Sequence, residues 1–306
     1  GGEVGKRIYC KTAVEDYINH VVSVAEVRFD GLNIAIDTAN GSASVCAKEI
    51  FTRLGAKCHM LSDTPNGVNI NLNCGSTHPE ELMAFVKANK LDLGVAFDGD
   101  ADRMLAVDEN GDLVDGDKII AICAAQMKQD GKLAKNTAVV TVMSNMGFFK
   151  FCEENDIKCA KTAVGDRYVL ERMLQKGYNI GGEQSGHVIF LDYATTGDGE
   201  LSAVKLIETV VKSGATLGSL AKIMTVYPQV LINVPVTPQG KLKYNNDEYI
   251  ISAVQEAEMD LNGDGRVLVR VSGTEPLVRV MLEGKNIEQI TKLGNQIAEV
   301  VKERLS

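Results

Sequence analysis

Residues 93–103 read LGVAFDGDADR, and this stretch decides how the rest of the chain is interpreted. Its first half is a short apolar run of the kind that forms a buried strand in an α/β sheet. Directly after that run, Asp98, Asp100 and Asp102 occupy alternate positions, which on an extended backbone lie on one side. Three gathered carboxylates repel one another unless a cation lies between them, and ligation by oxygen alone suits Mg²⁺ better than zinc or copper. We therefore expect Mg²⁺ at these aspartates, with Arg103 beside a phosphoryl group.

Two other interpretations of this acidic loop compete with magnesium binding. A calcium loop would place Glu109 at its twelfth position, but Arg103 occupies the glycine site and the flanks have strand patterns. A phosphatase of the haloacid dehalogenase type would use Asp98 as nucleophile and Asp100 as acid, yet Ala101-Asp102 replaces the usual Gly-Thr of that family. The phosphatase stays open as an alternative.

A second polar segment, RVSGTEP at residues 270–276, follows another strand-like run and has the composition of a phosphate clamp. Glycine between two hydroxyl residues lets the N–H groups of a turn face one anion, and nearby guanidinium groups complete the cradle. A purely structural turn would favour some of the same residues, but two arginines in an acidic protein favour the anion. The candidate phosphate ligands are Arg270, Ser272, Gly273, Thr274 and Arg279.

A third polar segment reads GGEQSGH over residues 181–187. Glu183, Ser185 and His187 stand at alternate positions and carry groups that donate and accept hydrogen bonds, so they could bracket the hydroxyls of a sugar ring. A polar surface loop would explain the pattern equally well. The segment TAVGDR at residues 162–167 has a simple local explanation as a loop that ends in a helix N-cap.

The composition excludes several classes of protein. A formal net charge of −9 argues against a general nucleic-acid surface, which needs clustered positive charge. No apolar run approaches the roughly 20 residues of a membrane helix, and the first residues lack the apolar core of a signal peptide. The seven cysteines are odd in number and form no C-x-x-C pair, which indicates reduced structural thiols. We expect a cytoplasmic protein without nucleic-acid or membrane partners.

The 306 residues exceed what one hydrophobic core usually organises, so several domains are expected. Strand-like runs alternate with helix-period segments over most of the chain. This pattern predicts two α/β domains with mixed sheets, residues 1–114 and 115–227, followed by a smaller C-terminal α+β domain, residues 228–306. Strands are expected at 32–36, 93–97, 104–107, 138–143, 230–234, 267–271 and 278–282. Helices are expected at 42–54, 79–89, 118–128, 166–175 and 247–258, with a long amphipathic helix after 286. The Asn-Gly pair at 110–111 predicts a hairpin turn.

The loops DGDADR, GEQSGH and RVSGTEP, in this order and one in each predicted domain, resemble the α-D-phosphohexomutase superfamily. Within this superfamily, the motif GGEQSGH is most similar to the bacterial phosphoglucosamine mutase branch. The segments CGSTHPE at 74–80 and TTGDG at 195–199 resemble the same branch. Ala101, where many relatives carry glycine, and Val271, where many carry proline, depart from the pattern.

The resemblance implies a family fold of four domains around a cleft, of which this chain would supply the last three. It also implies roles for individual residues. Asp98, Asp100 and Asp102 would hold Mg²⁺, with Arg103 as a catalytic residue. The residues that would face the substrate are Gly165, Asp166, Arg167, Glu183, Ser185 and His187. The residues that would grip the phosphate that is not transferred are Arg270, Ser272, Gly273, Thr274 and Arg279.

The resemblance further implies a mechanism. A phosphoserine gives its phosphoryl group to glucosamine 6-phosphate, and glucosamine 1,6-bisphosphate then returns the other group, leaving glucosamine 1-phosphate for amino-sugar nucleotides and peptidoglycan precursors. The 306 residues contain no T-x-S-H-x-P segment that would carry the serine. We therefore expect the N-terminal domain of the same protein to be a missing partner and this chain to be inactive alone. A homodimer stays open.

Three alternatives to this function remain. The first is a phosphomannomutase or phosphoglucomutase of the same superfamily. The second is the magnesium-dependent phosphatase, and the third is a sugar-phosphate-binding module without catalysis. Free phosphate released by this chain alone would indicate the phosphatase, and tight binding without turnover in the full-length protein would indicate the binding module.

Overall fold

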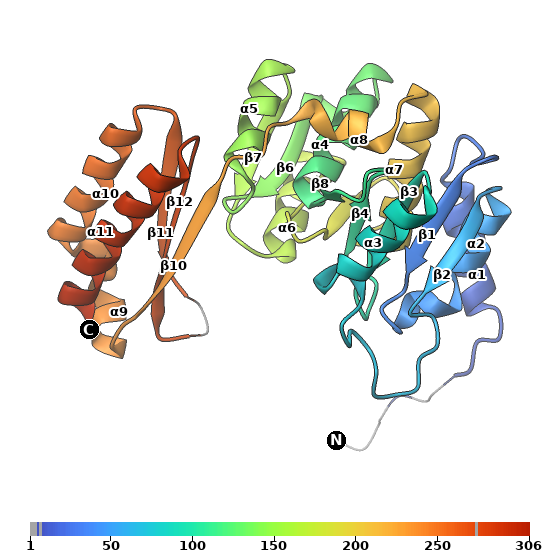
Figure 1. Ribbon diagram of the computed structural model, residues 1–306, viewed down its shortest axis with the longest axis horizontal. Helices are drawn as coiled ribbons and strands as arrows, with labels where there is room; N and C mark the ends of the chain where they lie inside the picture. Colours follow the sequence, from blue (N-terminus) through green and yellow to red (C-terminus); the bar gives the residue numbers. More distant parts are fainter. Residues whose placement is uncertain (1–4, 6–7, 273–274) are drawn as a thin grey trace. The chain divides into compact units, whose positions relative to one another are not determined.

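The computed structural model describes residues 5, 8–272 and 275–306. The chain divides into two compact units, each described by itself. Unit 1 contains Gly1–Ser144 and Phe151–Met224, and unit 2 contains Asn145–Lys150 and Thr225–Ser306 (Figure 1).

The first sheet of unit 1 has five strands in the order β2-β1-β3-β4-β5. β1, β2 and β3 run parallel, whereas β4 is antiparallel to β3 and β5 is antiparallel to β4. The strands are β1 (Asn33–Asp37), β2 (Lys57–Leu61), β3 (Leu93–Phe97), β4 (Met104–Val107) and β5 (Leu113–Val114). The apolar run directly before the three aspartates is β3, which is buried along its whole length. The predicted hairpin turn joins β4 to β5, with Gly111 at φ +86°.

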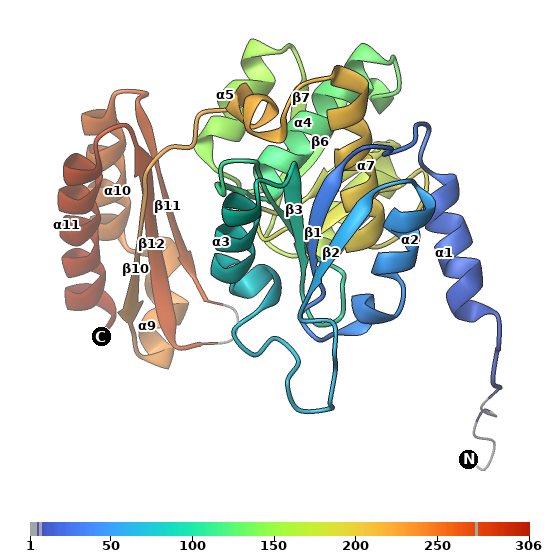
Figure 2. The same ribbon diagram turned by 45° about the vertical axis from the view of Figure 1, so that its right-hand side comes forward.

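The helices of this sheet lie on both faces. The connection from β1 to β2 and the connection from β2 to β3 run in opposite directions across the sheet, so right-handed crossovers place their helices on opposite faces. Figure 2 shows α3 on one side and α2 with α1 on the other. Leu82 and Val86 of α3 pack against Ala35 and Ala96 of the sheet. The helices are α1 (Ala13–Ser23), α2 (Ala47–Arg53) and α3 (Glu80–Asn89), with short 3₁₀ turns η1 (Ser42–Val45) and η2 (Gly75–Thr77).

The second sheet of unit 1 has four strands in the order β7-β6-β8-β9, of which only β9 runs antiparallel to its neighbour. The strands are β6 (Thr137–Thr141), β7 (Lys158–Thr162), β8 (Ile180–Gly182) and β9 (Val188–Phe190). Val169 and Met173 of α6 pack on Val139 and Ile189 of the sheet. The helices are α4 (Gly116–Gln129), α6 (Asp166–Lys176), α7 (Gly199–Ser213) and α8 (Leu217–Leu220), with η3 (Ala134–Asn136) and η4 (Ala221–Ile223). The expectation of mixed-sheet α/β domains is confirmed.

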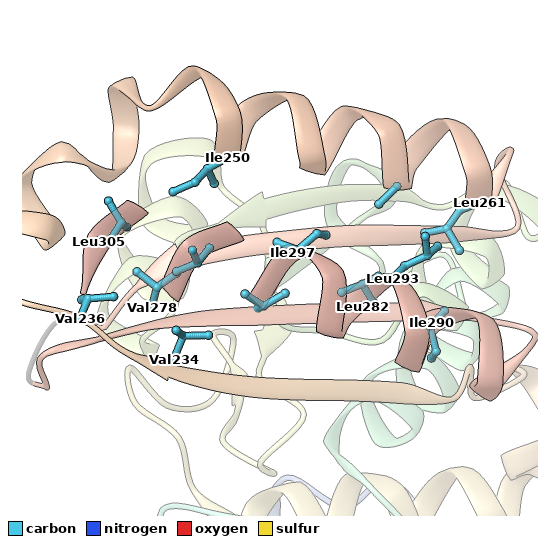
Figure 3. Close-up of a cluster of buried hydrophobic side chains, with 13 residues drawn as sticks. Val234, Val236, Ile250, Leu261, Val278, Leu282, Ile290, Leu293, Ile297 and Leu305 are labelled. Atoms are coloured by element: carbon cyan, nitrogen blue, oxygen red, sulfur yellow. The ribbon is translucent and has the colours of Figure 1, made fainter. Parts of the chain in front are cut away.

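Unit 2 is built on a three-stranded antiparallel sheet in the order β10-β12-β11. Its strands are β10 (Gln229–Pro235), β11 (Gly265–Val271) and β12 (Leu277–Gly284). Its helices are α9 (Pro238–Lys243), α10 (Glu248–Leu261) and α11 (Ile287–Leu305), with η5 (Tyr244–Asn246). Figure 3 shows side chains of α11, including Ile290, Leu293 and Ile297, gathered with Val278 and Leu282 of β12 in one core. Each such side chain contributes about 1.5–3 kcal/mol by leaving water. The predicted α+β domain is confirmed.

The sequence pattern does not predict the helix α5 (Met146–Glu154). Its first residues, up to Lys150, belong to unit 2. The Asn145 amide pairs with the backbone of Tyr227, accepting from its N–H at 2.9 Å and donating to its carbonyl at 3.0 Å. The backbone N–H of Met146 donates to the buried Glu283 carboxylate at 2.8 Å, and Arg266 donates to the same oxygen at 2.6 Å. These polar contacts hold residues 145–150 in unit 2. The boundaries 114/115 and 227/228 stay predictions.

Among the described residues, no helix combines the length and the apolar character needed to cross a bilayer.

Candidate active site

The loop after β3 gathers the three aspartates. One carboxylate oxygen from each of Asp98, Asp100 and Asp102 lies within 4.8 Å of the others. Asp98 is 1% exposed, because it continues the buried strand, whereas Asp100 is exposed and Asp102 is half-buried. The backbone is not extended as expected, since Ala101 has φ +61° and turns the chain. The carboxylates therefore meet through a left-handed turn and not through strand alternation.

Arg103 pairs with the buried Asp98. Its Nε donates to Asp98 Oδ2 at 2.8 Å, and its backbone N–H donates to Asp98 Oδ1 at 3.1 Å. Burial raises the pKa of Asp98, and the neighbouring guanidinium opposes that rise. The Arg103 side chain is 41% exposed, so it can also reach a phosphoryl group in solvent.

The donor set fits a small, hard dication. Asp102 Oδ1 is buried and accepts no hydrogen bond from the described residues, and its nearest cationic neighbour, Arg103 Nε, is 3.6 Å away. A buried carboxylate oxygen without a donor is costly unless a cation or water satisfies it. Asp98, Asp100 and Asp102 would hold Mg²⁺ through one oxygen each and leave further coordination positions for a phosphate.

The segment 183–187 forms the turn between β8 and β9, closed by a hydrogen bond from Glu183 N–H to the His187 carbonyl at 2.9 Å. This turn joins the aspartate loop through its backbone, because Met104 N–H donates to the Gly186 carbonyl at 3.0 Å. Gly186 has φ +97°, and a Cβ there would lie 2.4 Å from the Met104 carbonyl oxygen. Glycine is therefore required where the two loops meet.

His187 brings the two loops together at the level of side chains. The ring is 4% exposed, and its Nε2 lies 3.5 Å from Asp102 Oδ2 and 3.8 Å from Asp166 Oδ2. Neither ring nitrogen has a hydrogen-bond partner among the described residues. Gly197 packs directly on the ring, since a Cβ there would lie 2.4 Å from Nε2. The imidazole is thus held beside Asp102 and Asp166, with both ring nitrogens buried and without a hydrogen-bond partner among the described residues.

The other candidate residues of unit 1 divide into two groups. Glu183 is tied to the 162–167 loop, because its Oε1 accepts the backbone N–H of Gly165 at 3.0 Å. Ser185 is exposed at the tip of its turn. Arg167 points elsewhere: it pairs with Glu171 on α6 at 2.8 Å and is 82% exposed. The structure thus brings Glu183, Gly165, Asp166 and His187 together and leaves Arg167 outside the cluster.

The residues predicted to bind phosphate belong to unit 2. Arg270 and Arg279 are register partners across β11 and β12, and like charges directly opposite each other are destabilising without an anion. Burial, with a contribution from Arg279, lowers the pKa of Arg270. Arg279 Nε is buried without a hydrogen-bond partner among the described residues, although its Nη2 donates to Glu275 at 2.9 Å.

Ser272 is buried beside them, and its Oγ accepts the N–H of Glu275 at 3.2 Å. Gly273 and Thr274 lie outside the described residues.

Two contacts that position the turn at 183–187 do not follow from the sequence motifs. Gln184 donates to Asp115 Oδ2 at 3.1 Å, and Gly116 N–H donates to the Gln184 carbonyl at 3.0 Å. Asp115 also caps α4 by accepting from Lys118 N–H. The only signal in the sequence was the N-cap pattern before the predicted helix at 118–128.

Three family models match consecutive parts of the chain. They describe the phosphoglucomutase/phosphomannomutase α/β/α domain II over residues 15–111, the α/β/α domain III over residues 115–227 and the C-terminal domain over residues 231–300.

Similar proteins and solved structures agree with these matches. A phosphoglucosamine mutase from Brevibacillus brevis is 52% identical over 305 residues, covering 100% of this chain and 68% of that protein. One from Clostridium novyi is 50% identical over 304 residues, covering 99% of this chain and 68% of that protein.

Among solved structures, a phosphoglucomutase/phosphomannomutase family protein from Burkholderia thailandensis superposes with a TM-score of 0.77 at 19% identity, covering 96% of this chain and 66% of that one. The Aspergillus fumigatus N-acetylphosphoglucosamine mutase in complex with GlcNAc-6P and magnesium superposes with a TM-score of 0.73 at 20% identity, covering 96% and 65%. The two structures share the fold. Identity of about half over the whole chain shows more: the chain belongs to the phosphoglucosamine mutase family within the phosphoglucomutase/phosphomannomutase group.

Proposed function

We propose that this chain is the metal- and sugar-phosphate-binding part of a phosphoglucosamine mutase that interconverts glucosamine 6-phosphate and glucosamine 1-phosphate. The observation that carries the proposal is the gathering of Asp98, Asp100 and Asp102 within 4.8 Å, beside Arg103 and the buried ring of His187. Anionic ligands, a cationic arginine and an unpartnered imidazole are groups that phosphoryl transfer uses.

In this proposal Asp98, Asp100 and Asp102 would hold Mg²⁺, which would supply positive charge next to the oxygens of the phosphoryl group. Arg103 is oriented by its two contacts with Asp98 and presents its exposed side to the same group. His187 and Glu183 bind hydroxyl groups of the sugar, and their positions are held by Gly197 and Gly165. Gly165, Asp166 and Ser185 are proposed as further substrate contacts, and Arg167 would join them only by leaving Glu171.

The phosphate that is not transferred is proposed to bind in unit 2. Arg270 and Arg279 stand opposite each other in the sheet, and an anion between them would relieve their repulsion. Ser272, Gly273 and Thr274 would add hydroxyl and backbone donors.

The complete reaction needs a nucleophile. The chain spans 68% of the length of the Brevibacillus brevis relative, and we propose that a phosphoserine outside these 306 residues transfers the group through glucosamine 1,6-bisphosphate. On this proposal the chain alone does not turn over. The cytoplasmic location and the homodimer stay predictions.

The test joins the chain to the N-terminal third of the Brevibacillus brevis relative. With Mg²⁺ and catalytic glucosamine 1,6-bisphosphate, the fusion should interconvert glucosamine 6- and 1-phosphate faster than the corresponding glucose or mannose phosphates. Asp100→Ala should abolish activity, and the exposed Asp63→Ala serves as control. A fusion with equal rates on glucose or mannose phosphates would contradict the amino-sugar preference.

The phosphatase alternative is disfavoured by the environment of Asp98. Its carboxylate is 1% exposed and both oxygens accept hydrogen bonds from Arg103, which draw charge from the group and make it a weaker nucleophile. Phosphate release by the unfused chain, with Asp98 as the phosphorylated residue, would restore this alternative.

A further inference from the structure

We infer that Tyr17, on α1, is a positioning residue for the aspartate loop and acts on it through the first turn of α7. The inference rests on the proposed function in one respect, namely that Asp98, Asp100 and Asp102 hold Mg²⁺. Tyr17 contacts neither the aspartates nor any group expected to react, so its role is to hold the backbone that carries the ligands.

The first turn of α7 holds the aspartate loop directly. The backbone N–H of Gly199 donates to the Ala101 carbonyl at 2.9 Å. A Cβ on Gly199 would lie 2.8 Å from Phe97 and 2.9 Å from the carbonyl oxygens of Ala101 and Arg103, so only glycine allows this approach. Any movement of the α7 first turn is therefore transmitted to the carbonyl in the middle of the loop.

The loop depends on such an anchor because its backbone is disfavoured. Ala101 has φ +61°, a backbone conformation that residues with a Cβ rarely adopt. Residues in this region persist where the surroundings fix them. Ser42 N–H supplies a second anchor by donating to the Gly99 carbonyl at 2.9 Å.

On one side of the aspartate loop, no packed side chains could hold it in place of the hydrogen bonds from Gly199 and Ser42. A hollow of about 370 Å³ borders Asp100, Ala101 and Asp102, and its other walls include Tyr17 and Glu200. With open space there, the loop has room to relax if the polar anchor shifts.

Tyr17 fixes the α7 first turn by bridging its two carboxylates. The hydroxyl lies 2.9 Å from Asp198 Oδ1 and 2.7 Å from Glu200 Oε2. Asp198 caps α7, because the same oxygen accepts Leu201 N–H at 2.9 Å. Cys46 donates to the other oxygen of Glu200 at 2.8 Å. Residues from α1, the start of α2 and α7 thus meet at two acids that flank Gly199.

The count of protons shows why the hydroxyl matters. The Tyr17 hydroxyl is the donor to both carboxylates, and its one proton is shared between Asp198 Oδ1 and Glu200 Oε2. Burial raises the pKa of both Asp198 and Glu200. Without the hydroxyl, Asp198 and Glu200 lose the group that bridges them, and the first turn of α7, which carries Gly199, loses this contact with α1.

The experiment measures Mg²⁺ binding to the 306-residue chain by isothermal titration calorimetry. Loss of a group that supports metal ligands typically weakens metal binding by about 10–100-fold, and we expect about tenfold for Tyr17→Phe. Tyr244→Phe is the matched control, since it removes a tyrosine hydroxyl that donates to the Val269 carbonyl at 2.6 Å within unit 2. Its Mg²⁺ affinity should equal that of the parent chain.

Glu200→Gln separates position from charge. A glutamine amide donates to the Tyr17 oxygen and accepts from Cys46, so the bridge survives without the negative charge. We expect Mg²⁺ affinity within about twofold of the parent. A loss as large as that of Tyr17→Phe would show that charge, and not position, matters and would overturn the inference. Should Tyr17→Phe fail to fold, Cys46→Ala removes the other donor to Glu200 and should weaken binding in the same direction.

A second measurement does not need the metal. Hydrogen exchange of peptides covering residues 98–104, without Mg²⁺, should be faster in Tyr17→Phe than in the parent chain and unchanged in Tyr244→Phe. If the parent chain binds no Mg²⁺, the proposed metal site is wrong, and hydrogen exchange alone decides the positioning role. Equal exchange in Tyr17→Phe and the parent would overturn that role, as would equal Mg²⁺ affinity in a parent chain that does bind.

Discussion

Replacing Asp100 by asparagine should make the protein more stable without metal and insensitive to Mg²⁺. Asp100 is the exposed member of the aspartate cluster, so the substitution leaves packing unchanged and removes one charge. Sites built to bind a cation keep like charges together at a cost in stability. The same charge that destabilises the free protein is the one that Mg²⁺ would use.

The size of the effect follows from the geometry. The ligand oxygens lie within 4.8 Å of one another, where two unit charges repel by about 0.9 kcal/mol in water and about 3.5 kcal/mol at an effective dielectric constant of about 20. Asp100 takes part in two such pairs, and because it is exposed the lower value applies to each. Attraction to Arg103 offsets part of the repulsion. We expect a gain of about 1 kcal/mol, or a rise in Tm of about 2–4 °C.

The assay is differential scanning calorimetry with EDTA and with excess MgCl₂. At a Mg²⁺ concentration of about 100 times Kd, the parent chain should gain about 2.7 kcal/mol, whereas Asp100→Asn should gain nothing, so the order of the two Tm values reverses. Asp63→Asn, which removes an exposed charge elsewhere, should behave as the parent. An Asp100→Asn protein that is less stable in EDTA, or that still responds to Mg²⁺, would refute the reasoning.

Three further predictions concern contacts that stabilise the fold around the site. Hydrogen bonds from Lys132 and then Lys212 lower the pKa of Glu26 from 4.5 to about 2, so its contribution to stability is full above pH 4.5 and is lost as the pH falls towards 2. Urea unfolding at about pH 6 and about pH 3 should therefore show a steeper loss in the parent chain than in Glu26→Gln. Asn145→Ala leaves buried backbone groups without partners and should lower the free energy of unfolding by about 1–3 kcal/mol in urea. Gly186→Ala places a Cβ 2.4 Å from the Met104 carbonyl at a positive φ and should lower Tm and weaken Mg²⁺ binding in calorimetry. Unchanged stability in any of these variants would contradict the corresponding contact.

Much of the fold follows from local patterns. The strands expected at 93–97 and 104–107 are β3 and β4 without change of bounds, because buried runs between turn residues are unambiguous. Neither α1 nor β2 follows from the pattern. The edge strand β2 reads KCHML and is mostly half-exposed, so it lacks a continuous apolar run. The expected helix at 42–54 is a 3₁₀ turn followed by α2, because the chain kinks at Cys46.

Part of the candidate site can also be predicted from local sequence patterns. The acidic loop carries its ligands within five residues, so local spacing suffices to bring Asp98, Asp100 and Asp102 together. The support from Tyr17 and Asp198 is not readable, since these residues are 181 positions apart and meet only in the folded unit. The pairing of Arg167 with Glu171 was readable from their i,i+4 spacing on a predicted helix, which gives Arg167 a partner outside the site.

The most direct test of the metal site is anomalous diffraction from crystals of the chain soaked with Mn²⁺. We predict one strong peak about 2.0–2.5 Å from an oxygen of each of Asp98, Asp100 and Asp102, the range of hard-cation ligation by oxygen. A peak elsewhere, or no peak at these aspartates, would contradict the assignment.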